Sequence, residues 1–332
     1  MLRPAPVLVV VSSLLIFSGC VQDGPCPGSA RAAGPLTRPA PAEGNVFVSS
    51  SDPFSPGPLR VRTIPLGKCE QDVPAAVLIH TPEQAGLYPV VIFQHGFQSR
   101  NDHYDQILTH LASHGFVVVA PQMYEPGLGA FTGSPTATQE AETALLLVRW
   151  LDENLARLVG VSVDTARLGI AGHSRGGKVA WLAMRAAPAR FAAIAGVDPV
   201  DGTGGPPGRT GPQARVTAEP LAYDAPSLVI GCGRSGRCAP AGDNHVQFYA
   251  ASPAPAWHVV ATEYGHADML DEDVAQLAAL VCASNPDREP MRRLTAGLLV
   301  AFFRASLQGD ASAYPTLSDT LAAPATIEVE SK

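Results

Sequence analysis

A serine at the centre of a glycine-rich turn is the first feature that could do chemistry. Gly172-His173-Ser174-Arg175-Gly176 has the G-x-S-x-G spacing of a nucleophile elbow, a sharp strand-to-helix turn that exposes the serine hydroxyl. The bare pattern arises by chance in about one such chain in five, so its context decides. A serine nucleophile needs a base within hydrogen-bond reach and a carboxylate that orients this base. The sequence therefore has to supply a histidine and an acid.

Three of the nine histidines come late enough in the chain to serve Ser174 as base. His258 lies inside an alternating strand pattern, where a packing role is the ordinary interpretation. His245 follows "AGDN" at the start of an expected helix, where a capping or structural role is the ordinary one. His266 directly follows the last long apolar run, on the loop where a base belongs in this order of residues. We predict His266 as the base.

The orienting acid has three candidates. Asp198 ends the apolar run "FAAIAGVD", and Pro199 fixes the turn after it. Asp201 lies nearer a Gly-rich loop, where we expect it to be solvated. Asp243 stands further away, at an expected helix start. Because an orienting group needs rigid support, we predict Asp198 ahead of Asp201, with Asp243 third.

Two backbone N–H groups are needed to stabilise the negative charge that develops on a carbonyl oxygen. One would come from Arg175, directly after the serine, and the other from Phe97 in "FQHGFQS". A His-Gly pair can be an ordinary turn, but its place after an early core strand favours the functional interpretation. No Cys/His spacing predicts a zinc site, and we expect neither a metal nor a cofactor.

Short apolar runs alternate regularly with helical patterns. The expected strands are 75–80, 89–96, 116–122, 167–174, 191–198, 227–233 and 256–265. The expected helices are 103–114, 139–157, 176–187, 270–281 and 290–307. This alternation predicts an α/β fold, a mostly parallel sheet with helices on both faces. Its active site lies beyond the carboxyl ends of the strands, where Ser174 stands.

The first twenty residues have the pattern of a lipoprotein signal peptide. Arg3 precedes an apolar core too short to span a bilayer, and Ser18-Gly19-Cys20 resembles a lipobox. Ordinary secretion is the alternative. We expect Cys20 to be lipidated and the protein to be exported and held on the bacterial envelope, at the outer membrane if there are two. Residues 21–45 read as an Ala/Pro/Gly-rich tether, 46–308 as the catalytic domain and 309–332 as a loose tail.

Composition bounds the partners and the cross-links. The chain has 332 residues, 46% of them hydrophobic, and a net charge of −7 with scattered basic residues, which disfavours nucleic acid as a partner. Five cysteines follow Cys20, so at least one is unpaired, and the pairing stays open.

Three further features allow two interpretations each. Residues 202–220 could be a lid over the site or a linker between strands. An acidic group could suggest calcium but lacks EF-hand spacing, so a solvated helix start is preferred; it comprises Asp268, Asp271, Glu272 and Asp273. Lys178 and Arg175 could steer anions, although solvation on a helix surface is the simpler account.

Several blocks together resemble the chlorophyllase family of α/β-hydrolases. They are "PVVIFQHGF", "LASHGFVVVAPQMY", "LGIAGHSRGGKVAW", "GVDPVDG", "CAPAGDNHVQFY" and "YGHADMLDED", within about residues 60 to 305. The resemblance implies the triad Ser174, Asp198 and His266, and hydrolysis of the ester that joins phytol to the chlorophyll macrocycle. The lipoprotein leader and the 202–220 loop depart from the family pattern, so other hydrophobic esters, including the polyesters cleaved by cutinase-type relatives, stay open.

Two classes of function remain at this point. One is a metal-independent serine ester hydrolase, with lipase, thioesterase and peptidase activities as variants of the same acyl-enzyme chemistry. The other is a non-catalytic envelope lipoprotein that keeps the fold as a binding module. Every catalytic role has a residue to fill it, which favours the enzyme.

Overall fold

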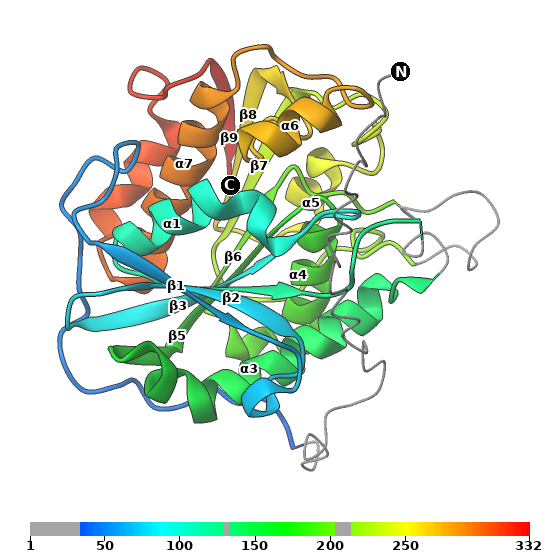
Figure 1. Cartoon of the computed structure of the whole chain (residues 1–332). Helices are drawn as coiled ribbons and strands as arrows, with labels where there is room; N and C mark the ends of the chain where they lie inside the picture. Colours follow the sequence, from blue (N-terminus) through cyan, green and yellow to red (C-terminus); the bar gives the residue numbers. More distant parts are fainter. Residues whose placement is uncertain (1–33, 129–132, 203–213) are drawn as a thin grey trace, which may run out of the picture.

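The computed structural model describes residues 34–128, 133–202 and 214–332. Figure 1 shows one twisted sheet with helices on both sides of it. The strand order is β1-β2-β4-β3-β5-β6-β7-β8-β9. The strands are β1 (Val61–Leu66), β2 (Ala76–Pro82), β3 (Leu87–Gln94), β4 (Val117–Gln122), β5 (Ser162–His173), β6 (Ala193–Val197), β7 (Ser227–Arg234), β8 (Ala256–Gly265) and β9 (Ile327–Ser331).

The centre of the sheet is parallel and its edges are antiparallel. All neighbouring pairs from β4 across to β8 are parallel, whereas β1, β2 and β9 join in the antiparallel sense. Every residue of β3 and β6 is buried, as expected for strands covered on both faces. All seven expected strands form, and the α/β-hydrolase type of architecture is confirmed. The expectation lacked β1 and β9, both short edge strands.

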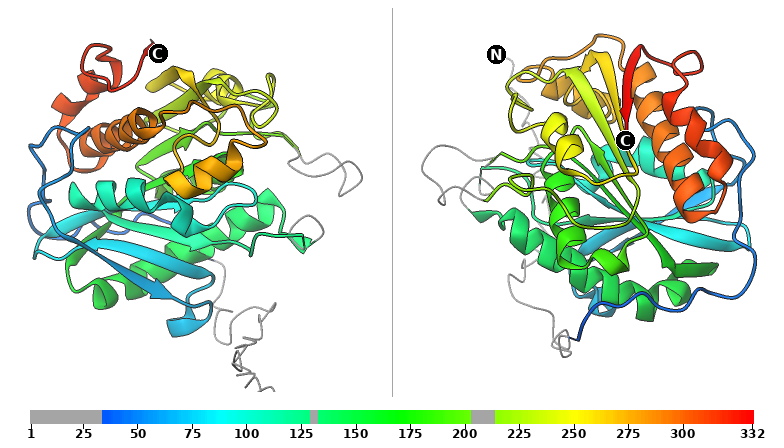
Figure 2. Two further views of the ribbon diagram at one scale, coloured as in Figure 1. Left: turned by 45° about the horizontal axis from the view of Figure 1, so that its top comes forward. Right: turned by 180° about the vertical axis from the view of Figure 1, so that it is seen from behind.

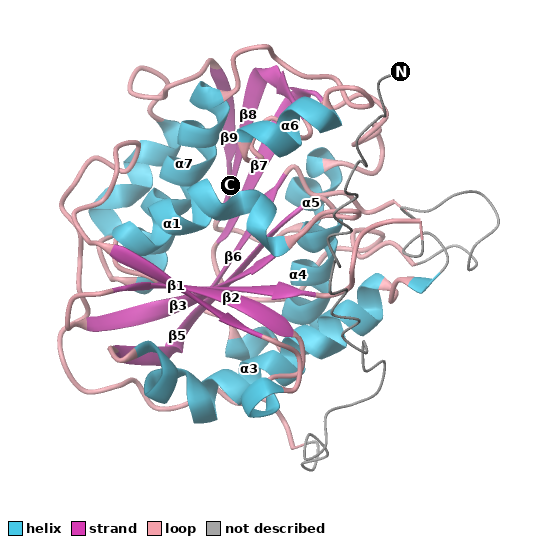
Figure 3. Ribbon diagram, viewed as in Figure 1, coloured by secondary structure: helices cyan, strands magenta, loops and turns pink. Residues whose placement is uncertain are grey.

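Helices cover the two faces in two separate cores. α1 (Asp105–Ser113) and α7 (Glu289–Leu307) pack on one face, and α3 (Ala137–Val159), α4 (Arg175–Ala186) and α5 (His245–Ala251) on the other. Figure 3 shows this layering of helix, sheet and helix. The short α6 (Glu272–Ala278) packs on the α1 and α7 side. The parallel strands therefore deliver their carboxyl ends to one edge between two helical layers.

Helix ends follow local rules. The side chain of Thr136 accepts from the backbone N–H of Gln139, whose side chain bonds back to Thr136, so α3 begins with a capping box. α3 ends at Gly160, whose φ of 64° is a left-handed conformation that favours glycine. The capping box fixes the first residues of α3, which lie beside the predicted site.

The end of the chain is not a loose tail, so that expectation is wrong. Residues Ala311–Ser318 form a 3₁₀ segment that buries Leu317, and β9 pairs antiparallel with β8 and buries Ile327 (Figure 2). The strand completes the sheet because β8 would otherwise present unpaired backbone groups at its outer edge. Its few apolar residues are separated by polar ones, which is why the segment resembled a tail.

The N-terminal side extends the folded unit as well. Arg38, in the expected tether, donates to the carbonyl of Phe191. The signal peptide, Cys20 and the first part of the tether lie outside the described residues. Among the helices that are described, none has both the length and the hydropathy needed to cross a bilayer.

Candidate active site

The turn between β5 and α4 has the geometry of a nucleophile elbow. Ser174 has φ 55° and ψ −124°, a strained conformation for a residue with a side chain. A Cβ on Gly172 would lie 2.3 Å from the carbonyl oxygen of Gly176, and one on Gly176 would lie 2.2 Å from that of Gln94. Only glycine fits at these two positions, so the spacing of the motif follows from backbone contact.

Ser174, His266 and Asp198 form one hydrogen-bonded chain. The hydroxyl of Ser174 lies 2.8 Å from Nε2 of His266, and Nδ1 of His266 lies 2.6 Å from Oδ2 of Asp198. They come from the carboxyl ends of β5, β8 and β6, three strands that the topology brings to the same edge. With Nδ1–H donating to the carboxylate, Nε2 is free to accept the proton of the serine.

Asp198 is held as an ion in the interior. Burial by itself would raise the pKa of its carboxyl, but the hydrogen bond and charge of His266 and the N–H of Cys232 bring the pKa below its ordinary value. Its φ of 40° is another left-handed conformation at a strand end. The carboxylate is therefore charged and fixed, as an orienting group must be.

The other two candidate acids are engaged elsewhere. The carboxylate of Asp201 lies 3.0 Å from the ammonium of Lys178 and accepts from the backbone N–H groups of Val216 and Thr217. Asp201 and Lys178 are both almost fully buried, so the expectation that they are solvated is wrong. Asp243 pairs with Arg215 instead.

The two alternative histidines form a pair of their own. Nδ1 of His245 lies 2.7 Å from Nε2 of His258, whose Nδ1 lies 3.1 Å from the carboxylate of Glu330 on β9. His245 stands behind the acid, with its Nε2 4.0 Å from Oδ1 of Asp198. Of the three histidines, only His266 has a hydrogen bond to Ser174 among the described residues.

The two residues predicted to supply N–H donors line the same cavity as the serine. Arg175 is the first residue of α4, where backbone N–H groups have no partner inside the helix. Phe97 lines the same cavity from the loop between β3 and α1. The positive end of the α4 dipole adds to the favourable field for an oxyanion.

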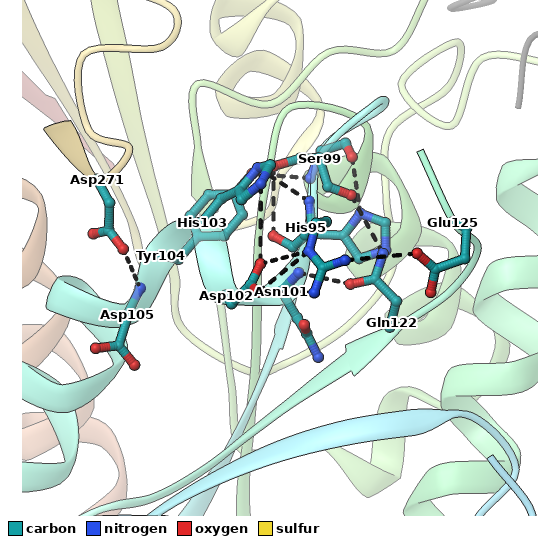
Figure 4. Close-up of polar contacts among 12 residues, drawn as sticks. His95, Ser99, Asn101, Asp102, His103, Tyr104, Asp105, Gln122, Glu125 and Asp271 are labelled. Carbon is teal, nitrogen blue, oxygen red and sulfur yellow. Dashed lines mark hydrogen bonds and ion pairs between the residues drawn. The ribbon is translucent and has the colours of Figure 1, made fainter. Parts of the chain in front are cut away.

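The loop that carries Phe97 is fixed by a polar network (Figure 4). The backbone N–H of Asn101 donates to the side chain of Gln122 at 2.7 Å, and its amide donates to the carbonyl of Ala120 at 2.8 Å. Next to the loop, Nε2 of His95 accepts from the N–H of Met123 at 3.0 Å. These hydrogen bonds therefore fix the loop to the end of β4.

The serine opens into a cavity of about 240 Å³, as far as described residues bound it. Its lining consists of Phe97, Ala137, Ser174, Arg175, Lys178, Val200, Gly202, Cys238, His266 and Cys282. Cys238 and Cys282 form a disulfide that contributes to the wall, and Cys232 is a buried free thiol, as an odd count requires. Residues 203–213 of the 202–220 loop lie outside the described residues.

Sequence reasoning missed a chain that joins three loops. Gly96 N–H donates to the hydroxyl of Tyr104 at 3.0 Å, which donates to Nδ1 of His173 at 2.8 Å, whose Nε2–H donates to the carbonyl of His266 at 2.8 Å. Burial and the charge of His266 lower the pKa of His173 to about 3, so this ring is neutral. The only signal in the sequence was a histidine inside the elbow motif.

Of the acidic group after β8, Glu272 and Asp273 lie in the first turn of α6, as expected for an acidic helix start, and Asp273 is exposed. The carboxylate of Asp268 accepts from the N–H groups of Gly265 and Asn285, and that of Asp271 accepts from the N–H groups that begin α1. Glu272 pairs with two arginines of the α7 region. The carboxylates of Asp268 and Asp271 hold the loop after His266 in place, so the expectation of a solvated helix start is wrong for these two residues.

Comparison with known proteins places this geometry in one family. The chlorophyllase family model matches residues 49–332. The chain belongs to the chlorophyllase family. The match includes the terminal strand β9.

Curated chlorophyllases share about a third of their residues with this chain. Chlorophyllase-2 of Arabidopsis thaliana is 35% identical over 268 residues, 74% of this chain and 82% of its own length. Chlorophyllase-1 of the same plant is 36% identical over 282 residues, covering 77% and 85%. Chlorophyllase type 0 of Chenopodium album is 34% identical over 312 residues, covering 87% and 86%. The protein is therefore an ester hydrolase of the α/β-hydrolase type.

Proposed function

We propose that the protein is a serine carboxylic-ester hydrolase of chlorophyllase type. The observation that carries this proposal is the hydrogen-bonded chain from Ser174 through His266 to Asp198, open to a cavity. Serine, imidazole and carboxylate in this order and at these distances are the arrangement that activates a hydroxyl. A binding module would have no need of a strained serine or of an ionised acid in the interior.

The reaction follows from the positions of the groups. Oγ of Ser174 attacks the ester carbonyl carbon while its proton passes to Nε2 of His266, and Asp198 stabilises the imidazolium. The N–H groups of Phe97 and Arg175 bind the oxyanion of the tetrahedral intermediate. Collapse breaks the C–O bond, and His266 gives its proton to the departing alcohol. A water molecule then hydrolyses the acyl-enzyme in the same way and restores the serine.

The substrate class we propose is a hydrophobic ester such as the phytyl ester of chlorophyll, which would yield chlorophyllide and phytol. Family membership supports it, as does the apolar share of the cavity wall, with Phe97, Ala137 and Val200 beside the serine. A cutinase-like polyester hydrolase or a general lipase or esterase would use the same chemistry, and is our second candidate. A panel of chlorophyll a, triglycerides, p-nitrophenyl esters and an aromatic polyester film separates them by kcat/KM.

A fluorophosphonate serine probe tests the mechanism. We expect the purified protein to be labelled, Ser174→Ala to be unlabelled, and the hydrolysis of p-nitrophenyl acetate to survive EDTA because the nucleophile is a side chain. Equal labelling of Ser174→Ala would refute the assignment. Activity that is lost with EDTA and restored by zinc or calcium would refute it too.

We propose a location as well: export and attachment to the bacterial cell envelope through a lipid on Cys20, at the outer membrane where there are two. The support is the sequence alone, the short apolar core followed by Ser18-Gly19-Cys20. We expect Cys20→Ala to be released into the soluble fraction or to remain unprocessed. A variant that is still cleaved and still fractionates wholly with membranes would contradict the anchor.

A further inference from the structure

The side chain of Arg175 has an environment that the proposed mechanism does not use. The mechanism needs only the backbone N–H of this residue, yet its guanidinium is nearly buried beside the cavity. Its Nε donates to Oε1 of Glu140 at 2.7 Å, and a terminal nitrogen donates to the carbonyl of Pro135. Glu140 is 1% exposed, so α3 supplies a buried counter-charge in its first turn.

The same guanidinium contacts two aromatic residues, Phe97 in the loop after β3 and Tyr124 in the loop after β4. Its central carbon lies 5.5 Å from the ring centre of Phe97 and 6.0 Å from that of Tyr124, within the range of cation–π attraction. Phe97 is the other predicted oxyanion donor. One side chain therefore connects the two segments whose N–H groups must converge on one oxygen.

Tyr124 fixes the segment from its other side. Its hydroxyl accepts from the N–H of Gln98 at 3.0 Å. Gln98 has a φ of 60°, and its side chain bonds in both directions to the backbone of Gly127. Phe97 is thus held between the guanidinium over its ring and the backbone hydrogen bond of the next residue, Gln98.

We propose that Glu140 and the Arg175 side chain are positioning residues that set the separation of the two oxyanion N–H groups. The proposal rests on the function proposed above. Glu140 fixes the guanidinium, the guanidinium fixes the ring of Phe97, and the backbone of Arg175 follows its own side chain. A buried arginine is suited to this because its planar fork pairs with a carboxylate and stacks on rings at once.

The first test is Glu140→Gln, which keeps the shape and removes the charge. Loss of one oxyanion donor costs about 10²–10³ in kcat, so a displaced donor should cost about 10- to 100-fold. We expect this loss in kcat for p-nitrophenyl acetate, with KM changed by less than about threefold, because the donors act on the transition state. The inhibition constant of phenylboronic acid, which forms a tetrahedral adduct with the serine, should rise by a similar factor.

The matched control is Asp152→Asn on the same helix. Asp152 binds the buried Arg190 at 2.6 Å, and neither residue lines the cavity. This variant also deprives a buried arginine of its counter-charge, so it should lower the melting temperature while kcat and the boronate constant stay within about twofold. A loss of kcat in Asp152→Asn equal to that in Glu140→Gln would reduce the effect to general destabilisation and overturn the proposal.

The second variant is Arg175→Lys, which keeps a positive charge and loses the fork and the flat stacking surface. We expect the same loss of kcat, with Arg190→Lys as its control. If Glu140→Gln does not fold, this pair decides. Glu140→Gln or Arg175→Lys with kcat and boronate affinity within twofold of the wild type would refute the proposal.

The pH dependence gives a readout that a structural role would not move. Burial raises the pKa of Glu140 to about 7, against the opposing charge of Arg175; Tyr124 is the other titratable group that faces it. Protonated Glu140 is neutral, like glutamine, so the ratio of wild-type to Glu140→Gln kcat should be largest above pH 7 and approach one below it. The groups other than Glu140 are the same in both proteins, so a ratio that does not change with pH would contradict the proposal. A wild type that the fluorophosphonate probe leaves unlabelled would instead refute the proposed function.

Discussion

Two buried carboxylates, three residues apart in the turn after β6, have opposite surroundings. Asp198 faces the imidazole of His266 at 2.6 Å and one backbone N–H. Asp201 faces the ammonium of Lys178 at 3.0 Å and two backbone N–H groups. Both are almost fully buried, so burial does not distinguish the acid that we propose as catalytic from the one that pairs with Lys178.

The difference lies in what each partner can do. An imidazole changes its charge during a reaction, and a carboxylate beside it stabilises the charged form. An ammonium paired in the interior holds two elements together, here α4 and the start of the 202–220 loop. The comparison predicts a loss of activity from one aspartate and a loss of stability from the other.

The largest effect should follow Asp198→Asn. An asparagine of the same shape cannot balance the imidazolium and favours the wrong tautomer of His266, so kcat should fall by about 10⁴. The fold should remain, since the neighbouring backbone can still bond the side chain. Steady-state kinetics and a melting curve measure the two parts; a variant that keeps most of its kcat would remove Asp198 from the triad.

Asp201→Asn should have the next largest effect, and on another quantity. The ammonium of Lys178 would be left in the interior without a counter-charge, which costs about 3–5 kcal/mol of the free energy of unfolding. We expect kcat to stay within about threefold, because Asp201 has no contact with His266 among the described residues. Urea unfolding and kinetics at one pH check this, and the reverse pattern in the two asparagine variants would exchange their roles.

The same pair of residues shows how far the sequence could lead. Asp198 was predictable because an apolar strand ends in it and a proline fixes the turn. The state of Asp201 was not, because no spacing indicates that Lys178, on the helix before, turns inward to meet it. Contacts between elements depend on packing, which periodicity does not encode.

In both the fold and the site, features with a local sequence pattern could be predicted, and contacts between distant segments could not. Continuous apolar runs predicted seven strands. The order serine, acid, histidine predicted which strand ends carry the three hydrogen-bonded residues of the candidate site. Two edge strands, the Cys238–Cys282 disulfide and the links through Tyr104 and Glu140 went unpredicted. Each of these joins segments distant in the sequence, and none has a local pattern of its own.

Acid should lower the free energy of unfolding through two buried histidines, His95 beside the loop that carries Phe97 and His173 in the elbow. Burial lowers the pKa of His95 to about 4, and burial with the charge of His266 lowers that of His173 to about 3. In the unfolded chain both take up a proton near pH 6.5, and in the folded protein they do not. Above pH 6.5 these two histidines therefore do not lower the free energy of unfolding, and below it this free energy decreases as the pH falls toward 4.

The expected slope is about 1.4 kcal/mol per pH unit for each histidine. Glu140, whose pKa is raised to about 7, contributes a slope of the opposite sign over the same range. Urea unfolding of Glu140→Gln at pH 7.5, 6.0 and 5.0 therefore measures the slope of the histidines, and equal free energies of unfolding at pH 7.5 and 5.0 in that variant would show that these rings take up protons in the folded state.

The smallest effect is expected for Tyr104→Phe. Tyr104 is connected to His266 through the ring of His173. Burial raises the pKa of the Tyr104 hydroxyl to about 12, so it stays a donor to Nδ1 of His173 while it accepts from Gly96. Phenylalanine keeps the ring and leaves two buried polar groups without a partner, which costs about 1–3 kcal/mol. Because the bonds of His266 to serine and acid remain, kcat should fall by less than about tenfold.

The control for this variant is Tyr88→Phe. The Tyr88 side chain is equally buried. Its hydroxyl donates a hydrogen bond to the carbonyl of Gln84 and is not part of the hydrogen-bonded chain that includes His173 and His266. Its loss should cost about 1 kcal/mol and leave kcat unchanged. Tyr104→Phe could lower the free energy of unfolding no more than Tyr88→Phe does and leave kcat unchanged. The Tyr104 hydroxyl would then not join the loop that carries Phe97 to the elbow.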